Sequence, residues 1–318
     1  MIRELLVMLA AFAAGVLIYP FAVTVLTLRG AGQRIAGYGP SAHRVKAGTP
    51  TLGGVVFIFL AVVAWIIADR SRAGFVPVFA LIGGALLGAL DDLVNVRSSH
   101  TLGLPARPKL AVEGVVGVLT GVGLYLTGFT QQYFPGLGAP DLHWGVIIVA
   151  ALAVVAATNA VNLTDGVDGL AASCTGVVFF AAAMIGVRTG NLPVTVLAAA
   201  LTGSLAAFLV YNWHPARLFM GDTGALALGA ALVAVTAELH LLWALPLLGI
   251  VFVVETLSVI VNVTAIRRFN RRLLRASPLH HHFEELGLRE QRLVAAFTAA
   301  AAVGAVFTVL YARLAGAL

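Results

Sequence analysis

The chain has 318 residues, of which 60% are hydrophobic and only 11% are charged. Soluble globular domains carry about 25% charged residues, so this composition excludes an ordinary soluble domain and predicts a polytopic membrane protein. The net charge of +6 does not indicate nucleic-acid binding, because the basic residues are scattered through loops. The single cysteine, Cys174, excludes an intrachain disulfide.

Ten apolar runs are candidates for membrane-spanning helices, since a helix that crosses a bilayer core needs about 20 apolar residues. They cover residues 4–28, 50–68, 74–90, 110–128, 144–161, 169–187, 192–211, 223–239, 241–266 and 292–314. The first run is longer than a signal-peptide core and lacks a convincing cleavage site, so we interpret it as a retained helix. The sequence therefore predicts an all-α fold in which residues 1–318 form a single transmembrane domain.

The basic residues favour one orientation across the membrane. If the amino terminus faces outside, 15 basic residues fall at inside positions and 5 fall at outside positions. Cytoplasmic loops are usually the more basic ones, so both termini are expected to be extracytoplasmic. The polar residues discussed below then all lie on the inside, which predicts an active site at the cytoplasmic face.

A pair of carboxylates, Asp91 and Asp92, ends the third apolar run. Neighbouring carboxylates on a helix point about 100° apart and repel each other unless a cation or a proton relieves them. One of them can contact a metal while the other faces a substrate. The alternative interpretation is a solvated helix end at the membrane interface.

Two carboxamides and two carboxylates, Asn159, Asn162, Asp165 and Asp168, stand between two apolar runs. If a helix begins near Thr164, that residue caps it and the two aspartates share one face. The alternative is a capped helix terminus favoured by the helix dipole, which accounts for one aspartate but not for the whole set.

A third acidic position, Asp222, lies in the segment from Asn212 to Gly224, where Pro215 limits helix continuation. Oxygen ligands from several loops suit Mg²⁺, which commonly uses one or two carboxylates together with substrate phosphates. The alternative is an ordinary turn on the inside.

Three successive histidines, His280, His281 and His282, lie in the one long inside loop. Zinc-binding histidines on a helix prefer a spacing of four residues, so we interpret these three as donors toward anionic oxygens. The arginine-rich run before them, residues 267–275, is typical of a segment that anchors on anionic lipid.

The stretch 47–54 can hold phosphate through backbone amides and hydroxyls, or its glycines can serve close helix packing. Glu113 and Glu255 lie inside apolar runs and are expected to face the interior of the bundle. With Lys46 and Lys109, the inside positions hold several carboxylates, three histidines and two lysines. This combination is typical of metal-assisted phosphoryl transfer at a bilayer surface.

Six stretches, in chain order, resemble the phospho-N-acetylmuramoyl-pentapeptide transferases, a branch of the polyprenyl-phosphate N-acetylhexosamine-1-phosphate transferases. They are Gly-Thr-Pro-Thr-Leu-Gly-Gly (48–54), Asp-Asp (91–92), Asn-Leu-Thr-Asp-Gly-Val-Asp-Gly-Leu (162–170), Phe-Met-Gly-Asp-Thr-Gly-Ala-Leu-Ala-Leu-Gly (219–229), Glu-Thr-Leu-Ser-Val-Ile (255–260) and Pro-Leu-His-His-His-Phe-Glu (278–284). The resemblance runs from about residue 44 to 290.

The resemblance implies ten transmembrane helices, of which the ninth breaks and protrudes toward the cytoplasm, in a bacterial inner-membrane protein. It implies transfer of phospho-MurNAc-pentapeptide from UDP-MurNAc-pentapeptide to undecaprenyl phosphate with Mg²⁺, which gives lipid I and UMP. A homodimer surrounded by membrane lipid is also implied, although the sequence gives no interface.

The resemblance also carries roles over to individual residues. It implies that Asp222 is a Mg²⁺ ligand, that Asp91 and Asp92 are an essential pair that deprotonates or positions the lipid phosphate, and that Lys109 is an active-site lysine. The implied catalytic set also includes His280, His281 and His282. The implied uridine pocket is Asp168, Asn212 and Phe219, and further substrate-binding positions are Lys46, Thr51, Asn162 and Asp165.

One departure from the family pattern concerns a lysine that often follows the aspartate pair, where this chain has Asn95. That lysine is either absent or supplied elsewhere, by Lys46 or Arg97. Two alternative functions are a transferase that moves GlcNAc-1-phosphate to a polyprenyl phosphate, against which the histidine run argues, and a secondary transporter. A transporter would be expected to show inverted repeats and charges at the middle of the membrane.

Overall fold

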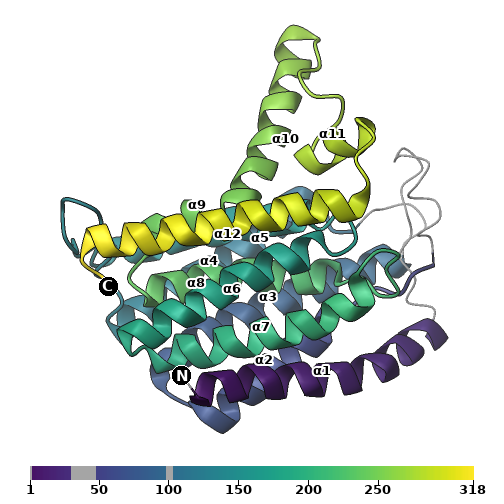
Figure 1. Cartoon of the computed structure of the whole chain (residues 1–318). Helices are drawn as coiled ribbons and strands as arrows, with labels where there is room; N and C mark the ends of the chain where they lie inside the picture. Colours follow the sequence, from purple (N-terminus) through teal and green to yellow (C-terminus); the bar gives the residue numbers. More distant parts are fainter. Residues whose placement is uncertain (1, 30–47, 98–102) are drawn as a thin grey trace.

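The computed structural model describes residues 2–29, 48–97 and 103–318, and its regular secondary structure there is helical (Figure 1). The helices are α1 (Ile2–Leu28), α2 (Gly54–Ala68), α3 (Arg72–Arg97), α4 (Ala106–Thr127), α5 (Gly145–Thr164), α6 (Leu170–Thr189), α7 (Leu192–Asn212), α8 (Gly221–Glu238), α9 (Leu245–Leu248), α10 (Ile250–Phe269), α11 (Leu279–Glu285) and α12 (Glu290–Ala315), with a 3₁₀ turn at Leu242–Ala244. The expected all-α membrane fold is confirmed.

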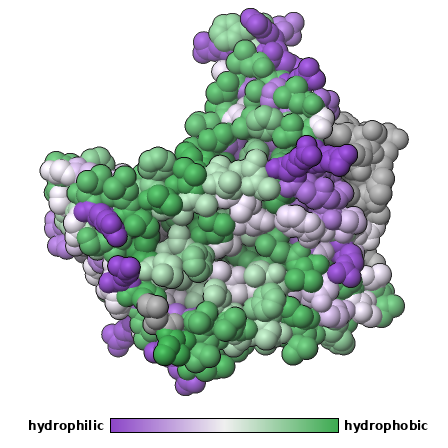
Figure 2. All heavy atoms as spheres, viewed as in Figure 1, coloured by the Kyte–Doolittle hydropathy of each residue, from purple (hydrophilic) through white to green (hydrophobic). Residues whose placement is uncertain are grey.

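Eight of the described helices are long and apolar enough to cross a membrane. Of the other two predicted spans, α2 has only 15 residues, and α8 carries an acidic residue near each end. Figure 2 shows hydrophobic residues over most of one face of the helical body, with hydrophilic residues gathered toward the helix ends and on the segment that projects from the body. This distribution is that of a multi-pass membrane protein.

The boundaries of two predicted elements differ from the observed ones in ways that matter for the site. The run predicted to end at residue 90 continues as α3 to Arg97, so Asp91 and Asp92 lie within a helix and not at its end. The run 241–266 is divided at Gly249 between α9 and α10, and α10 projects from the body with α11 beside it (Figure 1). The break of this predicted span is therefore confirmed.

Helix α8 is the central element of the bundle. Every residue from Thr223 to Glu238 is buried, because α2, α3 and α5 all pack against this helix. Its sequence is rich in Ala and Gly, and small residues of this kind allow membrane helices to approach each other closely. As a result, side chains from several helices meet at each end of α8.

Two glycines of α3 bring its backbone against α8. A Cβ atom at Gly88 would lie 2.1 Å from the carbonyl oxygen of Asp222, and one at Gly84 would lie 2.5 Å from that of Leu226. On the other side, a Cβ atom at Gly54 of α2 would lie 2.4 Å from the Cα atom of Gly224. These contacts are with backbone atoms, so α8 could not keep its place if larger residues stood there.

We expect Gly88→Ala to destabilise the protein, because the added methyl group forces α3 and α8 apart. Overpacking of this kind costs about 1–3 kcal/mol. The matched control is Gly114→Ala in α4, where an added Cβ atom would meet nothing within 4 Å. Thermal unfolding of the purified proteins in detergent measures the difference, and equal melting temperatures for the two variants would contradict the close packing.

Candidate active site

A lysine joins two aspartates from different helices at one end of the bundle. The Nζ atom of Lys109, in the first turn of α4, lies 2.6 Å from Oδ2 of Asp91 in α3 and 2.8 Å from Oδ2 of Asp222 at the start of α8. The backbone amide of Leu104 also donates to Asp91. Ionised groups that are mutually hydrogen-bonded in this way form strong and geometrically specific contacts.

The end of α5 completes this cluster. Asn162 donates a hydrogen bond of 2.8 Å from Nδ2 to Oδ1 of Asp222. Asp222 is thus held from two sides, although 31% of its side chain remains exposed, against 6% for Asp91. A cavity of about 250 Å³ is lined by this cluster, whose members are Asp91, Asp92, Asn95, Gly103, Leu104, Lys109, Asn162 and Asp222.

Asp92 has a different environment from that of Asp91. Its Oδ1 atom accepts from the backbone amide of Asp222 at 3.1 Å, and its Oδ2 atom accepts from the amide and the hydroxyl of Thr223 at 2.9 and 2.6 Å. A carboxylate in this place satisfies the unpaired amides at the start of a helix and complements its dipole. Asp92 therefore fixes the position of α8, and with it that of Asp222.

The donor set of the cavity fits a divalent cation that prefers oxygen ligands. The lining contains three carboxyl groups and one lysine, and Asn162 and Asn95 add amide groups. Mg²⁺ is commonly held by one or two carboxylates plus phosphate oxygens, and it keeps several waters. Asp222, the most exposed of the bridged groups, is the residue best placed to meet such an ion.

The segment after α5 is a turn and not the start of a helix, which corrects the expectation for Thr164. Helix α5 ends at Thr164, whose hydroxyl donates to the carbonyl of Ala160, and α6 begins only at Leu170. Gly169 has a φ angle of 81°, which favours glycine over other residues. Asp165 and Asp168 therefore lie on a loop and do not share a helical face.

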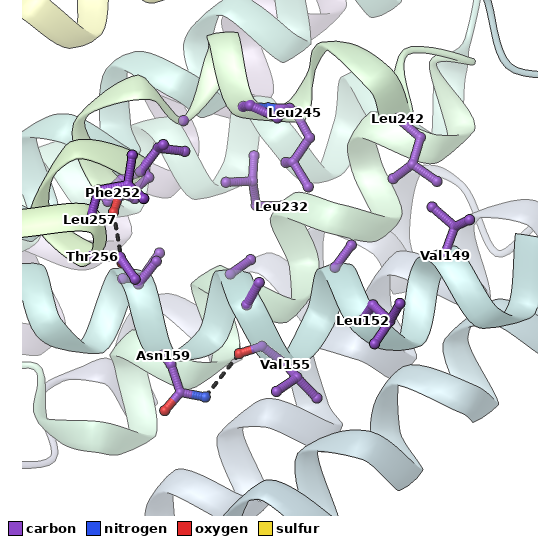
Figure 3. Close-up of a pocket in the computed structure, with 18 of the residues that line it drawn as sticks. Val149, Leu152, Val155, Asn159, Leu232, Leu242, Leu245, Phe252, Thr256 and Leu257 are labelled. Atoms are coloured by element: carbon purple, nitrogen blue, oxygen red, sulfur yellow. Dashed lines mark hydrogen bonds between the residues drawn. The ribbon is translucent and has the colours of Figure 1, made fainter. Parts of the chain in front are cut away.

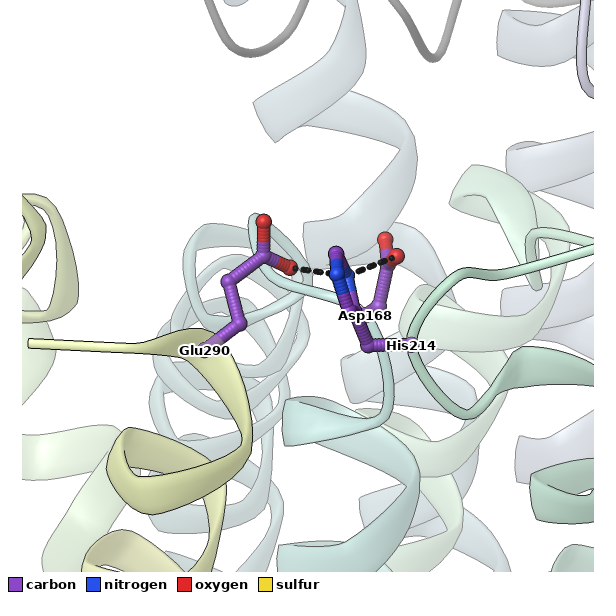
Figure 4. A group of neighbouring side chains, drawn as sticks. All are labelled: Asp168, His214 and Glu290. Atoms are coloured by element: carbon purple, nitrogen blue, oxygen red, sulfur yellow. Dashed lines mark hydrogen bonds and ion pairs between the residues drawn. The ribbon is translucent and has the colours of Figure 1, made fainter.

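Asp168 belongs to a second polar cluster, shown in Figure 4. The Nδ1 atom of His214 lies 3.1 Å from a carboxylate oxygen of Asp168 and 3.1 Å from one of Glu290. Asp168 also accepts a hydrogen bond from the amide of Ala216. The three side chains offer ligand atoms within 4.8 Å of one another, a spacing that would suit a metal ion. Neither His214 nor Glu290 was predicted from the sequence, because nothing in their spacing relates them to Asp168.

The other predicted substrate positions lie on loops that hydrogen bonds join to one another. Asn212 is buried and joins two loops, since its Oδ1 atom accepts from the amide of Gly169 and its Nδ2 atom donates to the carbonyl of Leu218. Phe219 is half-buried, and its backbone pairs with Pro50 and Gly53. The hydroxyl oxygen of Thr51 and Oδ2 of Asp92 both lie close to Gly221. Each would be 2.6 Å from a Cβ atom placed on that glycine. Lys46 lies outside the described residues.

The three histidines differ in their surroundings. His280 is fully buried, with Nδ1 3.2 Å from a carboxylate oxygen of Glu255, and burial lowers the pKa of its imidazole despite that carboxylate. The Nδ1 atom of His281 lies 2.6 Å from Glu284, and that of His282 accepts from the amide of Arg275. We therefore interpret His280 as a positioning residue, whereas His281 and His282 remain partly accessible.

His280 connects α11 with the loop that follows α5. A Cβ atom at Gly166 would lie 2.4 Å from Nε2 of His280, so the imidazole packs directly against this loop. The structure thus brings Asp91, Asp92, Lys109, Asn162 and Asp222 around one cavity. The histidines do not line that cavity, and His280 packs against the loop that lies between Asn162 and Asp168.

An apolar cavity of about 670 Å³ lies beside the polar one and was not anticipated from the sequence. It is lined by α5, α8, α10 and neighbouring segments, and Figure 3 shows mainly aliphatic side chains around it. On α4, Leu110 lines the apolar cavity and Lys109 the polar one; on α5, Asn159 lines the apolar cavity and Asn162 the polar one. Residues one or three positions apart on a helix are close in space, so the two cavities are neighbours.

Comparisons with known proteins find relatives that match most of this chain. The family model for glycosyl transferase family 4 matches residues 74–240. The phospho-N-acetylmuramoyl-pentapeptide-transferase of Moorella thermoacetica is 46% identical over 279 residues, which are 86% of this chain and 87% of that protein. That of Shouchella clausii is 38% identical over 313 residues, or 96% of this chain and 95% of that protein.

A third relative with the same name, from Oceanobacillus iheyensis, is 40% identical over 304 residues, which are 92% of this chain and 93% of that protein. The segment matched by the family model includes Asp91, Lys109, Asn162 and Asp222, which form the polar cluster. Relatives of this identity that extend over almost the whole chain share its fold and its family. The chain therefore belongs to the phospho-N-acetylmuramoyl-pentapeptide transferases, within glycosyl transferase family 4.

Proposed function

We propose that this enzyme transfers phospho-MurNAc-pentapeptide from UDP-MurNAc-pentapeptide to undecaprenyl phosphate and so forms lipid I and UMP for peptidoglycan synthesis. The observation that carries the proposal is the Lys109 bridge between Asp91 and Asp222, at the junction of a polar and an apolar cavity. A polyprenyl phosphate has the same division, a long apolar chain with one charged end.

The lipid carrier is proposed to lie with its chain in the apolar cavity and its phosphate beside Lys109. The aliphatic lining removes the chain from water, and Lys109 supplies a positive charge at the mouth of the cavity. Asp91 is proposed to orient the lipid phosphate or to accept its proton. We assign this role to Asp91 because its carboxylate contacts Lys109, whereas the carboxylate of Asp92 bonds the amides of Asp222 and Thr223 at the start of α8.

Asp222 is proposed to be the Mg²⁺ ligand, with Asp91 and Asn162 close enough to support it. When bound, the ion withdraws charge from the pyrophosphate of the nucleotide substrate and so eases departure of UMP. The residues of the chain then hold the phosphates in line for attack by the lipid phosphate oxygen. A direct displacement needs no covalent intermediate on an aspartate, and for this reason we propose it.

The nucleotide half of the substrate is proposed to bind along the loops that carry Asp165, Asp168 and Phe219. The half-buried ring of Phe219 offers a face for uracil, Asn212 joins the neighbouring loops through its side chain, and the backbone of Phe219 bonds Pro50 and Gly53. His281 and His282, with Lys46, are proposed to act as donors toward the anionic oxygens of the sugar phosphate. The site is proposed to face the cytoplasm of a bacterial inner membrane, in a homodimeric enzyme.

The proposed reaction is tested with purified protein, radiolabelled UDP-MurNAc-pentapeptide and undecaprenyl phosphate. We expect Mg²⁺-dependent formation of labelled lipid I that EDTA abolishes, and much less product with UDP-GlcNAc. Asp222→Asn keeps the shape and removes the charge, so its turnover should fall by at least about 100-fold. The exposed Asp141→Asn is the control variant. Near-normal turnover of Asp222→Asn at saturating Mg²⁺ would exclude the metal role.

We expect Phe219→Ala to weaken binding of the UDP-sugar by about 5- to 150-fold, on the scale of base stacking on aromatic rings. Binding of undecaprenyl phosphate should not change, and Phe219→Trp should be tolerated. Apparent affinities for both substrates and the melting temperature are measured on the same preparations. Equal losses for both substrates with a lowered melting temperature would assign Phe219 to helix packing instead.

The proposed orientation is tested by cysteine labelling in intact cells. Leu318→Cys should react with a membrane-impermeant maleimide, and Leu273→Cys, in the segment between α10 and α11, should react only after permeabilisation. Both leucines are exposed, at 40% and 55%, whereas the native Cys174 is buried and gives a low background. The reverse pattern would place the polar cluster on the extracytoplasmic side.

A further inference from the structure

A second polar cavity lies at the far end of α8 from the candidate active site. Asp222 stands at the start of α8 and Glu238 at its end, and 16 residues of helix separate them by about 24 Å. The cavity has a volume of about 520 Å³ and is lined by residues of several segments: Ala73, Phe129, Tyr133, Thr189, Gly190, Asn191, Leu192, Pro193, Glu238, Leu239, His240 and Ala317. This volume lies within the range of small-molecule sites.

The carboxylate of Glu238 is the unusual group in this cavity. Its side chain is fully buried, and neither of its oxygens has a hydrogen-bond partner in the part of the chain that the structure describes. A buried carboxylate without a donor is strongly unfavourable unless a cation or a proton compensates it. Among the residues that the structure describes, no lysine or arginine lines the cavity, and Asp69 adds a second negative charge in the vicinity.

The backbone around Glu238 is, by contrast, fully bonded. The carbonyls of Val235, Thr236 and Ala237 accept from the amides of Leu239, Leu241 and His240. The carbonyl of Glu238 accepts from the side chain of Asn191 at 2.8 Å. The fold thus supplies a donor for each carbonyl of the last turn of α8 and none for the carboxylate. A negative charge at a helix carboxyl end is also disfavoured by the helix dipole, so this position attracts a cation.

Aromatic rings line the same cavity as Glu238. The ring of His240 lies 5.4 Å from that of Phe129 and 6.2 Å from that of Tyr133. The Nδ1 atom of His240 donates to the carbonyl of Gln131 at 2.7 Å, which fixes the imidazole in place. Aromatic faces next to a buried carboxylate are a favourable environment for an organic ammonium group. Thr189 and Gly190 at the rim are exposed, so the cavity is open to a ligand from outside.

We propose that this cavity binds a primary ammonium group, with Glu238 as its counter-ion and Phe129, Tyr133 and His240 as its aromatic wall. The cavity is larger than an ammonium group alone, so the ligand carries further atoms, as in an aminoethyl group. Such a group can come from the headgroup of a phosphatidylethanolamine or from a free amine. The site is separate from the transferase site and takes no part in the proposed reaction.

The proposal is tested by thermal unfolding of the full-length protein in detergent with ethanolamine at constant ionic strength. We expect a saturable rise in melting temperature with ethanolamine and none with ethylene glycol, which has the same size and no charge. Glu238→Gln should reduce the affinity at least about tenfold. Phe129→Leu keeps an apolar side chain and removes the aromatic face, and it should weaken binding several-fold even if Glu238→Gln does not fold.

The control variants separate this site from general electrostatic effects and from the transferase. Asp141→Asn removes an exposed negative charge from the loop that carries Phe129 and Tyr133, and Asp222→Asn disables the proposed metal site; both should bind ethanolamine like the wild-type protein. The proposal is overturned if ethanolamine gives no saturable shift or if Glu238→Gln and the wild-type protein respond alike. Either result would mean that Glu238 holds a proton.

The source of the ammonium group is decided by competition. Phosphatidylethanolamine in mixed micelles should displace ethanolamine if the natural ligand is a lipid, whereas phosphatidylglycerol should not. Failure of both lipids to compete, with ethanolamine still bound, would identify a free amine as the ligand.

Discussion

The hydrogen bonds from the start of α8 to Asp92 are the contact on which the candidate active site depends. Asp92 accepts from the amides of Asp222 and Thr223 and from the Thr223 hydroxyl, while Gly88 allows the α3 backbone to approach α8 closely. These contacts fix the first turn of α8 in position and rotation. The carboxylate of Asp222 then points toward Lys109 and Asn162. The charged cluster is therefore formed before any substrate binds.

The place of this cluster within the bundle follows from the cost of charge in a membrane. A charged side chain at the bilayer centre costs about 2.5–3.5 kcal/mol on insertion scales, so the carboxylates gather where helices end. The cluster nevertheless adjoins an aliphatic cavity, because Lys109 and Leu110 on α4, and Asn162 and Asn159 on α5, face the two compartments. A substrate with one apolar and one phosphorylated part can thus use both compartments without moving its charge into the membrane core.

The apolar runs predicted the helices well, because length and hydropathy determine which segments cross a membrane. The sequence also predicted the acidic positions, since Asp91, Asp92 and Asp222 interrupt or flank apolar runs. It did not predict which aspartate stabilises a helix and which faces the cavity. That difference arises from the approach of α3 to α8, two segments about 130 residues apart, and no local pattern contains it. For the same reason His214 and Glu290 were missed, and Thr164 was placed at the start of a helix that begins six residues later.

The two acids of α8 show that residue type and position in a helix do not determine the surroundings of a carboxylate. Asp222 and Glu238 both stand near an end of an apolar helix, and only Asp222 was singled out from the sequence. The fold gives Asp222 a lysine and an asparagine as donors, but it leaves both carboxylate oxygens of Glu238 without a donor in the described chain. An acid at a helix amino end is favoured by the dipole, and one at the carboxyl end is opposed by it. Glu238 therefore lies at the end of α8 where the helix dipole disfavours a negative charge, and its carboxylate has no donor among the described residues where that of Asp222 has two. A cationic ligand would supply the positive charge that the protein does not.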